Sequence, residues 1–312
     1  MKFSITIPTY KSLYLNEAIQ SVVGQSYADW ELIVVDDCSP EDLRSVVAPY
    51  LHDARVRYYR NKRNCGAVNL VDNWNICLSY CTGDYVVCMG DDDRLLPNCL
   101  QDYSKLIERH PELNVYHTRT EIIDDNGKLT DLQEQRPEWE SAIAMLWNRW
   151  DHRNHQYIGD FCYRTDYLRK SGGYYKLPLA WGSDDITALR AAVGKGIANT
   201  QVFGFQYREN RQTISSSQDN MRLKIEACKS QHEWLSDFLR ELSHSELSAL
   251  DREYLQTILP HRDEHFLVTF TRDCTDYISG SPLRALWCYR LLRPLGYSRM
   301  RVMKWFLKSL RP

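Results

Sequence analysis

The sequence lacks several features by which other classes of protein are known. No apolar stretch approaches the ~18 residues needed to span a membrane, and the strand-like FSITI (3–7) begins so early that we expect no signal peptide before it. No G-x-G-x-x-G loop is present, which excludes the usual dinucleotide-binding dehydrogenase. The ten cysteines include no Cys-x-x-Cys pair, so a zinc site has little support and reduced thiols in the cytoplasm are expected. With a net charge of only −2, no global basic field indicates a nucleic-acid partner.

What the sequence does contain is an ordinary globular composition, with 43% hydrophobic and 26% charged residues. A chain of 312 residues can bury a sizeable core and predicts one large domain or two modest ones. Over the first 110 residues strand-like and helix-like segments alternate, which predicts parallel pairing with helices on the faces of the sheet. The expected strands are 3–7, 31–35, 56–59 and 85–89, and the expected helices are 14–25, 39–51 (capped by Ser39) and 68–80.

The rest of the chain divides into a less regular part and a helical part. Between 111 and 215 we expect a strand at 113–124, a hairpin turn at 125–127, a helix at 140–150 and a strand at 160–164. From 221 onward the pattern is mostly helical and carries no motif with a known chemistry. The predicted class is therefore α/β, a mostly parallel sheet with flanking helices followed by a helical C-terminal region.

Three polar clusters follow separate predicted strands, namely Pro8-Thr9-Tyr10, Asp36-Asp37 and Asp91-Asp92-Asp93. Open parallel sheets bind ligands beyond the carboxyl ends of their strands, so we expect the three clusters to meet at one edge. Adjacent carboxylates repel one another, and a hard divalent cation, Mg²⁺ or Mn²⁺, would offset that repulsion. A solvated acidic turn or a helix cap is the alternative for each acidic cluster taken alone.

Four motifs in order carry a family resemblance: PTY (8–10), VVDDCS (34–39), TGDYVVCMGDDDRLLP (82–97) and GSDDITALR (182–190). Together they resemble the inverting glycosyltransferases of family 2, which have the GT-A fold, over roughly residues 1–215. The resemblance implies a nucleotide-sugar donor, UDP-linked, and a saccharide or lipid-linked saccharide acceptor in surface polysaccharide synthesis. By this reading 1–110 is the nucleotide-sugar-binding half of a GT-A domain, 111–215 is its acceptor-binding half and 216–312 is a helical C-terminal region.

The same resemblance assigns roles to residues of the three polar clusters. Pro8, Thr9, Tyr10 and Asp37 would line the nucleotide pocket, with Tyr10 near the base. A carboxylate only accepts hydrogen bonds, so Asp37 suits a base that presents a donor, such as uracil N3–H. Asp92 would hold the metal, with Asp93 supporting it and Asp91 near the ribose. Arg208 or Arg211 would pair with the diphosphate; the alternative is two surface arginines on a loop.

Two positions depart from the family pattern. Gly90 stands two positions before the expected metal ligand, where many members have an acid. Asn73-Trp74-Asn75 stands where many members have Ala-Arg-Asn, so an arginine contact is lost or moved.

The GSDDITALR segment would supply the catalytic base. An inverting transfer needs a carboxylate to take the proton from the acceptor hydroxyl. The family position favours Asp184, because Arg190 follows six residues later, and Asp185 is its rival. Two acids that simply begin a helix at Ser183 are the alternative, since acids suit a helix N-terminus.

Residues 281–312 concentrate positive charge, with eight Lys or Arg and no acid. The other 280 residues hold 31 basic and 41 acidic groups, a net charge of −10. Basic residues interleaved with tryptophans and leucines suit a peripheral contact with the cytoplasmic face of a membrane. Packing on the acidic remainder of the fold, or a contact between the subunits of a homodimer, are the alternatives.

Two other functions compete with a glycosyltransferase. A sugar nucleotidyltransferase shares the general sheet but usually has a glycine-rich loop after the first strand, and PTYKSLY (8–14) has no glycine. The other alternative is a degenerate GT-A protein that acts as a non-catalytic binding subunit. The cellular function of such a protein would survive the loss of Asp92 or Asp184.

Overall fold

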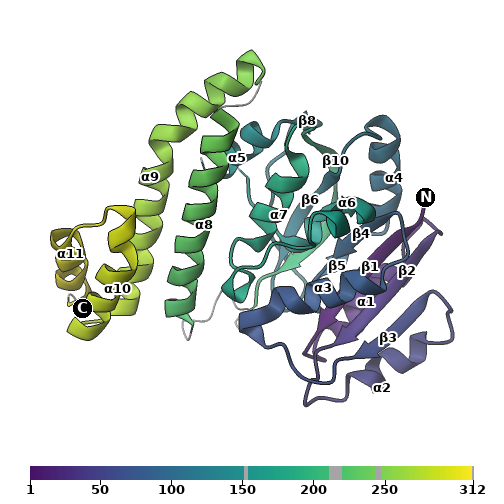
Figure 1. The fold of residues 1–312 in the computed structure, drawn as a ribbon. Coiled ribbons are helices and arrows are strands. Elements are labelled where there is room, and N and C mark those ends of the chain that lie inside the picture. Colours follow the sequence, from purple (N-terminus) through teal and green to yellow (C-terminus); the bar gives the residue numbers. More distant parts are fainter. Residues whose placement is uncertain (151–153, 211–219, 244–246, 311–312) are drawn as a thin grey trace. The chain divides into compact units, whose positions relative to one another are not determined.

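The computed structural model describes residues 1–312 except 151–153, 211–219, 244–246 and 311–312. The chain divides into two units (Figure 1). The sheet unit consists of residues 1–176 and 183–213, and the helical unit consists of 177–182 and 214–312. The predicted α/β class with flanking helices and a helical C-terminal region is confirmed. The sheet is mixed rather than mostly parallel, because four of its described strand pairs are parallel and five are antiparallel.

The sheet has ten strands, and its N-terminal half is parallel. Along the main path the order is β3 (Val56–Arg60), β2 (Trp30–Asp36), β1 (Phe3–Thr9), β4 (Tyr85–Cys88), β9 (Phe161–Arg164), β6 (Val115–Ile123), β10 (Ile197–Arg208) and β5 (Arg94–Leu95). The first four strands run parallel, β9 is antiparallel to both its neighbours, and β10 is parallel to β6. Two short strands complete the sheet: β7 (Leu129–Leu132) pairs with β6, and β8 (Trp139–Glu140) pairs with β10.

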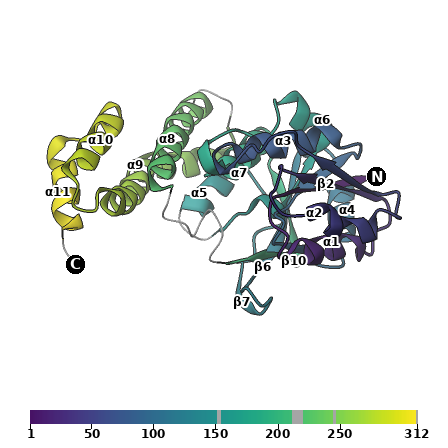
Figure 2. The ribbon, with the colours of Figure 1, turned by 90° about the horizontal axis from the view of Figure 1, so that it is seen from below.

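Helices cover both faces of this sheet because consecutive parallel strands need crossover connections. Figure 2 shows α1 and α4 on one face and α3, α6 and α7 on the other. Their bounds are α1 (Leu15–Val23), α2 (Leu43–Val47), α3 (Leu70–Tyr80), α4 (Cys99–Arg109), α5 (Ala142–Trp150), α6 (Thr165–Lys170) and α7 (Ser183–Ala192). All seven residues of β2 are buried, which explains why its sequence is a continuous apolar run rather than an alternating one.

Two sequence predictions about individual elements are corrected by the structure. The second helix begins at Leu43 rather than near Ser39, because Asp42 is its N-cap and accepts from Ser45 N at 3.2 Å. Ser39 Oγ instead donates to the Tyr10 carbonyl at 2.7 Å. Strand β10 was not expected from the sequence, since its buried residues are separated by polar ones and its pairing with β6 contains register shifts.

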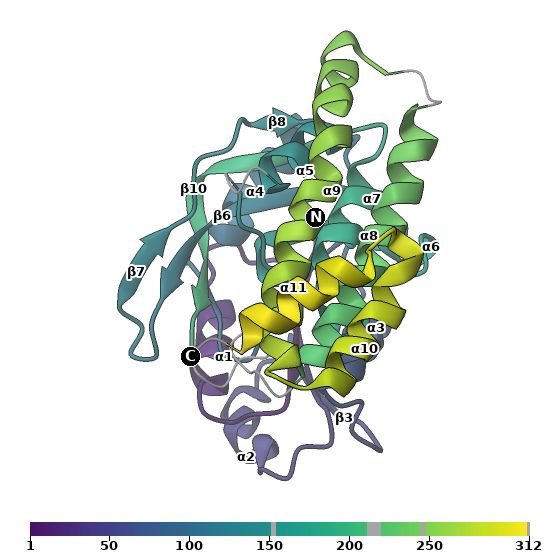
Figure 3. The ribbon, with the colours of Figure 1, turned by 90° about the vertical axis from the view of Figure 1, so that its left-hand side faces the viewer.

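The described part of the helical unit contains four α-helices, in which α9 packs against each of the others: α8 (Met221–Ser243), α9 (Ala249–Ile278), α10 (Pro282–Leu292) and α11 (Arg299–Ser309). Helices α8 and α9 form a pair, and Figure 3 shows α11 lying across α9. Among the residues that the structure describes, no helix has both the length and the apolar character needed to cross a bilayer.

Candidate active site

The loop after β1 is fixed by an acid from the predicted metal motif. Asp91 Oδ2 accepts hydrogen bonds from Thr9 Oγ1 at 2.9 Å, from Tyr10 N at 2.8 Å and from Lys11 N at 3.0 Å. Strands β1 and β4 are parallel neighbours, so their carboxyl ends bring these residues together across about 80 positions of sequence. The PTY and GDDD motifs therefore lie side by side, and Tyr10 remains exposed beside them.

Asp37 lies next to the same loop and binds the segment that follows β3. Its backbone N–H donates to the Thr9 carbonyl at 2.9 Å. Its carboxylate accepts from Asn61 Nδ2 at 2.8 Å, from Cys65 N at 2.9 Å and from Gly66 N at 3.3 Å. Asp37 is thus a buried acceptor at the edge where β1 and β2 end.

Asn73 of α3 shares the donor that Asn61 offers to Asp37. The Asn61 Nδ2 that serves Asp37 also donates to Asn73 Oδ1 at 3.0 Å, and Asn73 is buried. The Asn61 amide therefore connects Asp37 to Asn73 of α3.

The other acid of the pair has a structural role. Asp36 Oδ2 accepts from the Tyr58 hydroxyl at 2.6 Å and from Arg60 Nη1, and its Oδ1 accepts from Ser39 N at 2.7 Å. Asp36 is fully buried between β1 and β3 and does not cap α2. Of the two acids only Asp37 faces the 61–66 segment.

Asp92, which is partly buried, and Asp93, which is buried, form a pair of like charges. Asp92 Oδ2 accepts from Asn210 Nδ2 at 2.8 Å, and Asp93 Oδ1 accepts from Arg208 N at 2.9 Å. Burial, followed by the charge of Asp91, raises the pKa of Asp92. Burial, followed by the charge of Asp92, raises the pKa of Asp93 well above its ordinary value. The two carboxylates are therefore electrostatically costly as anions unless a cation accompanies them.

Gly90 is required by the position of these carboxylates. A Cβ at this residue would lie 2.7 Å from Asp92 Oδ1 and 2.8 Å from Asp93 Oδ2. The oxygens converge on the space that a side chain would occupy, which explains why no acid stands there. Two converging carboxylate oxygens fit a divalent cation that completes its shell with water and phosphate oxygens. Within the described part of the chain, no cluster of three or more His, Cys, Asp or Glu could enclose a metal by itself.

Arg208 is buried at the end of β10 and its guanidinium contacts protein acceptors. Nε donates to the Asp92 carbonyl at 2.8 Å, Nη1 to the carbonyls of Asp124 and Asp125 at 3.1 Å, and Nη2 to Glu17 Oε2 at 2.8 Å. The surface-arginine alternative is therefore wrong for Arg208, which holds the Asp92 loop in place. Its contact with a diphosphate stays a prediction, and Arg211 lies outside the described residues.

Asp184 and Asp185, at the start of α7, have different surroundings. Asp185 Oδ1 accepts from Arg149 Nε at 3.1 Å and from Gln156 Nε2 at 2.7 Å. Asp184 Oδ1 accepts from the backbone N–H of Asp185 at 3.0 Å. Burial raises the pKa of Asp184 to about 7, the charge of Asp185 adds to the rise, and Arg149 opposes it. Asp185 is thus bound by a guanidinium and an amide, whereas the pKa of Asp184 is raised into the neutral range.

The start of α7 and the metal motif are linked through η3 (Ile158–Asp160). The register of β9 against β4 places Val87 opposite Cys162, so η3 lies beside the carboxyl end of β4 where the acidic triplet begins. The charge of Asp160 is a further, smaller cause of the raised pKa of Asp184. Asp37, Asp91 and Asp92 thus lie at the carboxyl ends of neighbouring parallel strands, and Asp184 lies near Asp160 of η3, which adjoins the end of β4.

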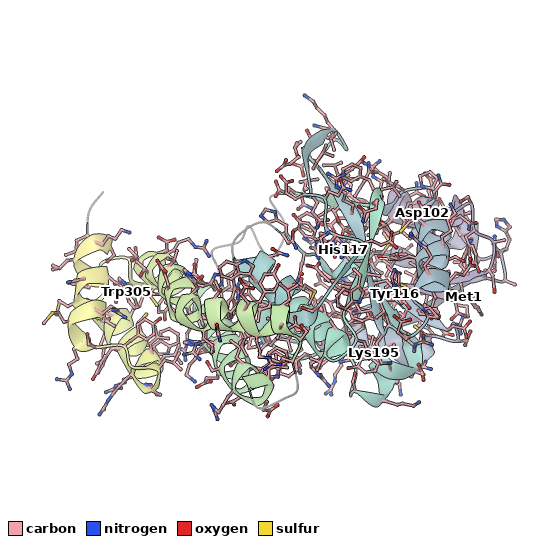
Figure 4. The ribbon with its side chains drawn as sticks, turned by 90° about the horizontal axis from the view of Figure 1, so that it is seen from above. Met1, Asp102, Tyr116, His117, Lys195 and Trp305 are labelled. Carbon is pink, nitrogen blue, oxygen red and sulfur yellow. The ribbon has the colours of Figure 1, made fainter. Side chains whose placement is uncertain are left out.

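A buried polar cluster beneath this region was not found from the sequence. Asp160 Oδ2 accepts from Thr120 Oγ1 and Gln133 Nε2, both at 3.1 Å, and lies 3.4 Å from His117 Nε2. Burial, followed by the charge of Arg136, lowers the pKa of His117 to about 4, so this histidine on β6 (Figure 4) is neutral. The residues come from separate strands and loops, and their spacing in the sequence carries no signal of the cluster.

The family is identified by comparison with known proteins. The model of glycosyl transferase family 2 matches residues 4–172, more than half of the chain. The chain belongs to this family and is a glycosyltransferase.

Individual relatives are consistent with the family. EpsE of Bacillus subtilis (strain 168), provisionally assigned as a glycosyltransferase, is 27% identical over 235 residues, which are 72% of this chain and 81% of that protein. The GalNAc(5)-diNAcBac-PP-undecaprenol β-1,3-glucosyltransferase of Campylobacter jejuni is 32% identical over 131 residues, 41% of each chain.

A solved structure confirms the fold. The crystal structure of residues 1–349 of Staphylococcus aureus TarS in complex with UDP-GlcNAc has a TM-score of 0.68 and 19% sequence identity. The match covers 99% of this chain and 90% of that one. The fold is therefore GT-A with additional C-terminal helices.

Proposed function

We propose that the protein is a metal-dependent, inverting hexosyltransferase. It moves a sugar from a UDP-sugar to a saccharide or lipid-linked saccharide acceptor in the synthesis of a surface polysaccharide. The observation that carries the proposal is the meeting of Asp37, Asp91 and the Asp92–Asp93 pair at the carboxyl ends of β1, β2 and β4, and the raised pKa of Asp184 supports it further. TarS, which resembles this chain in fold, was solved with UDP-GlcNAc, and the Campylobacter relative acts on an undecaprenol-linked acceptor.

In this proposal the donor binds at the carboxyl ends of β1, β2 and β4. Asp37 accepts from uracil N3–H with the acceptor capacity that remains beside its three protein donors, since a carboxylate offers about four lone-pair sites. Tyr10, exposed at this edge, lies near the base, and Pro8, Thr9 and Asp91 line the nucleotide pocket around the ribose.

Asp92, supported by Asp93, would hold Mg²⁺ or Mn²⁺ together with the diphosphate. When bound, the metal offsets the negative charge that develops on the departing diphosphate. The chain's own contribution is to present two carboxylates whose oxygens converge in front of Gly90. Asn210 and the Arg208 backbone fix the other oxygen of each carboxylate.

Asp184 is the base of the single displacement. Its carboxylate takes the proton of the acceptor hydroxyl as that oxygen bonds to the anomeric carbon. The bond from this carbon to the diphosphate oxygen breaks, and the configuration inverts. A base with a pKa near the working pH is the most effective kind, and that of Asp184 is about 7. Asp185 is the less suitable candidate because Arg149 and Gln156 already bind it.

A transfer assay tests this function. The wild-type enzyme is incubated with UDP-sugars, Mn²⁺ and a set of saccharide and polyprenyl-linked saccharide acceptors, and released UDP is measured. We expect acceptor-dependent release of UDP that is lost in Asp92→Asn and in Asp184→Asn. The control is Asp166→Asn, which should keep this activity because Asp166 is an exposed acid paired with Lys170 on α6. Equal activity of all three variants would rule out these roles, and UDP binding without turnover would favour the non-catalytic subunit.

The proposed place of action is the cytoplasm. All ten cysteines are free thiols, eight of them buried, which suits a reducing compartment.

A further inference from the structure

Helix α11 carries apolar side chains on two opposite faces. Val302 and Trp305 (Figure 4) are buried, and Trp305 Nε1 donates to Thr271 Oγ1 of α9 at 3.1 Å, so this face anchors the helix in its unit. The opposite face is exposed to solvent. We call it the α11 stripe, and it consists of Met300, Met303, Leu307 and Leu310, which are 72%, 57%, 56% and 55% exposed.

The spacing of the stripe makes it continuous. Its members are three, four and three positions apart, which places them in one row along a helix. Isolated exposed apolar residues need no explanation, but a row of four on a helix that already buries another face does. Helix α10 packs beside α11 and also exposes large apolar residues, with Leu283 at 80% and Leu286 at 44%.

Cationic side chains border the stripe. At about 100° per residue, Lys304 and Lys308 lie along one flank and Arg299 lies along the other. All three are exposed, as are Arg301 and the arginines of α10. Within the described part of the chain, none of these basic residues forms an ion pair with a carboxylate. Arg299 and Arg301 lie over the rings of Tyr289 and Tyr297, contacts that do not neutralise their charge.

The sign of this charge selects the partner. Residues 281–312 carry eight basic residues and no acid, whereas the rest of the chain has a net charge of −10. A symmetric contact between two copies of the stripe would bring cations against cations and would be repulsive. An anionic lipid surface offers both an apolar layer for methionine and leucine and negative headgroups for lysine and arginine.

We propose that the α11 stripe docks the protein on the surface of an anionic lipid bilayer. Met300, Met303 and Leu307 enter the boundary between headgroups and acyl chains, and the flanking Lys304, Lys308 and Arg299 contact the headgroups. The inference is independent of the glycosyl-transfer proposal, because it rests on the helical unit alone and its test requires no turnover.

Vesicle flotation with the full chain tests the proposal. Vesicles of equal parts phosphatidylglycerol and phosphatidylcholine are compared with vesicles of phosphatidylcholine alone. We expect the wild type to float with the anionic vesicles only, and less so at high salt, because salt screens the headgroup charge. Each Lys or Arg near such a surface strengthens binding about fivefold. Replacing Arg301, Lys304 and Lys308 by Gln should therefore weaken binding on the order of a hundredfold.

An apolar variant and two control variants complete the design. Met300→Ser, Met303→Ser and Leu307→Ser together should abolish flotation while leaving the buried face of α11 intact. The apolar control is Val268→Ser with Leu250→Ser, at exposed residues of α9. The charge control replaces Lys105, Lys128 and Lys170 of the sheet unit by Gln. Both controls should float as the wild type does.

Three outcomes would overturn the proposal. The first is a wild type that ignores anionic vesicles, and the second is flotation unaffected by either set of α11 substitutions. The third is a wild type that sediments as a dimer and becomes a monomer in the apolar variant without binding vesicles, which would make the stripe a contact between copies.

Discussion

At the scale of single residues, adjacent acids with the same sequence appearance acquire different chemistry from distant neighbours. Asp184 and Asp185 are indistinguishable in GSDDITALR, apart from the family position that favours Asp184. The structure separates them through Arg149 and Gln156, which lie 36 and 29 positions away from Asp185. No local pattern could have revealed those partners, because they depend on where the 140–160 region folds.

The proposed base should impose a pH dependence on the rate. Since the pKa of Asp184 is about 7, kcat/KM should rise as the pH increases through 7 and then level off. Arg149 opposes the rise of this pKa, whereas the charges of Asp185 and Asp160 add to it. Arg149→Gln should therefore move the rising limb to higher pH, and Asp184→Asn should lower the rate by roughly 10²–10⁴-fold. If kcat/KM rises at the same pH in Arg149→Gln as in the wild type, Arg149 does not influence the pKa of the catalytic base.

Gly90 provides a second test at this scale. In Gly90→Ala the added carbon would force Asp92 Oδ1 and Asp93 Oδ2 from positions 2.7 and 2.8 Å away. We expect the affinity for Mn²⁺ in the presence of UDP, measured by calorimetry, to fall by about tenfold or more, which corresponds to ~1.4 kcal/mol. Gly24→Ala is the matched control, since its added carbon would lie 3.2 Å from a single carbonyl oxygen. Unchanged metal affinity in Gly90→Ala would show that the carboxylates of Asp92 and Asp93 do not bind the metal.

At the scale of elements, the alternation of strands and helices was predictable from the sequence, whereas the long strand β10 was not. The segments 3–7, 31–35, 56–59 and 85–89 all became strands because each is a short apolar run beside helical periodicity. Strand β10 escaped prediction because its partners β6, β8 and β5 are far away in sequence and its register shifts break any alternation. The family resemblance singled out its last residue, Arg208, but the sequence did not predict that Arg208 is buried at the end of a strand.

Arg208 should matter for stability as well as activity. Its guanidinium connects β10 to Glu17 of α1 and to carbonyls of the Asp92 and Asp124–Asp125 turns. Arg208→Gln should lower the free energy of unfolding by roughly 2–4 kcal/mol, because buried acceptors lose a charged donor. Arg109→Gln, an exposed arginine paired with Glu138, should change it by less than about 0.5 kcal/mol. Chemical denaturation of both variants measures the difference, and equal stabilities would show that Arg208 does not hold these turns.

At the scale of the whole molecule, the predicted class and the convergence of motifs at one sheet edge followed from strand order alone. The hydrogen bonds that hold this edge of the sheet together could not be predicted in the same way. They depend on Glu31, which joins segments from three parts of the chain. Glu31 accepts from Ser4 Oγ at 2.6 Å, from Thr82 N at 2.6 Å and from Arg57 Nη2 at 2.9 Å. Nothing in ELIVV marks its glutamate as a tie between β1, β2, β3 and the turn before β4.

This tie should shape the acid stability of the protein. Burial alone would raise the pKa of Glu31, but the hydrogen bonds from Ser4, Thr82 and Lys2 outweigh it and lower the pKa to about 2. A carboxyl with a lowered folded pKa stabilises the fold above its unfolded value near 4.5, and this stability is lost as the pH falls toward 2. Glu31→Gln should therefore flatten the pH dependence of unfolding between 4.5 and 2, whereas the exposed Glu112→Gln should not. Identical acid profiles for wild type and Glu31→Gln would contradict this role.

The proposed glycosyl transfer depends on carboxylates that bind a nucleotide diphosphate together with a divalent cation. Isothermal titration of UDP into the wild-type protein, with Mn²⁺ and then with a chelator, addresses this most directly. We predict saturable binding of UDP with Mn²⁺, a large loss of affinity in the chelator and a comparable loss in Asp92→Asn with the metal present. Binding of equal strength with and without the cation, or no binding of UDP in either condition, would contradict the account.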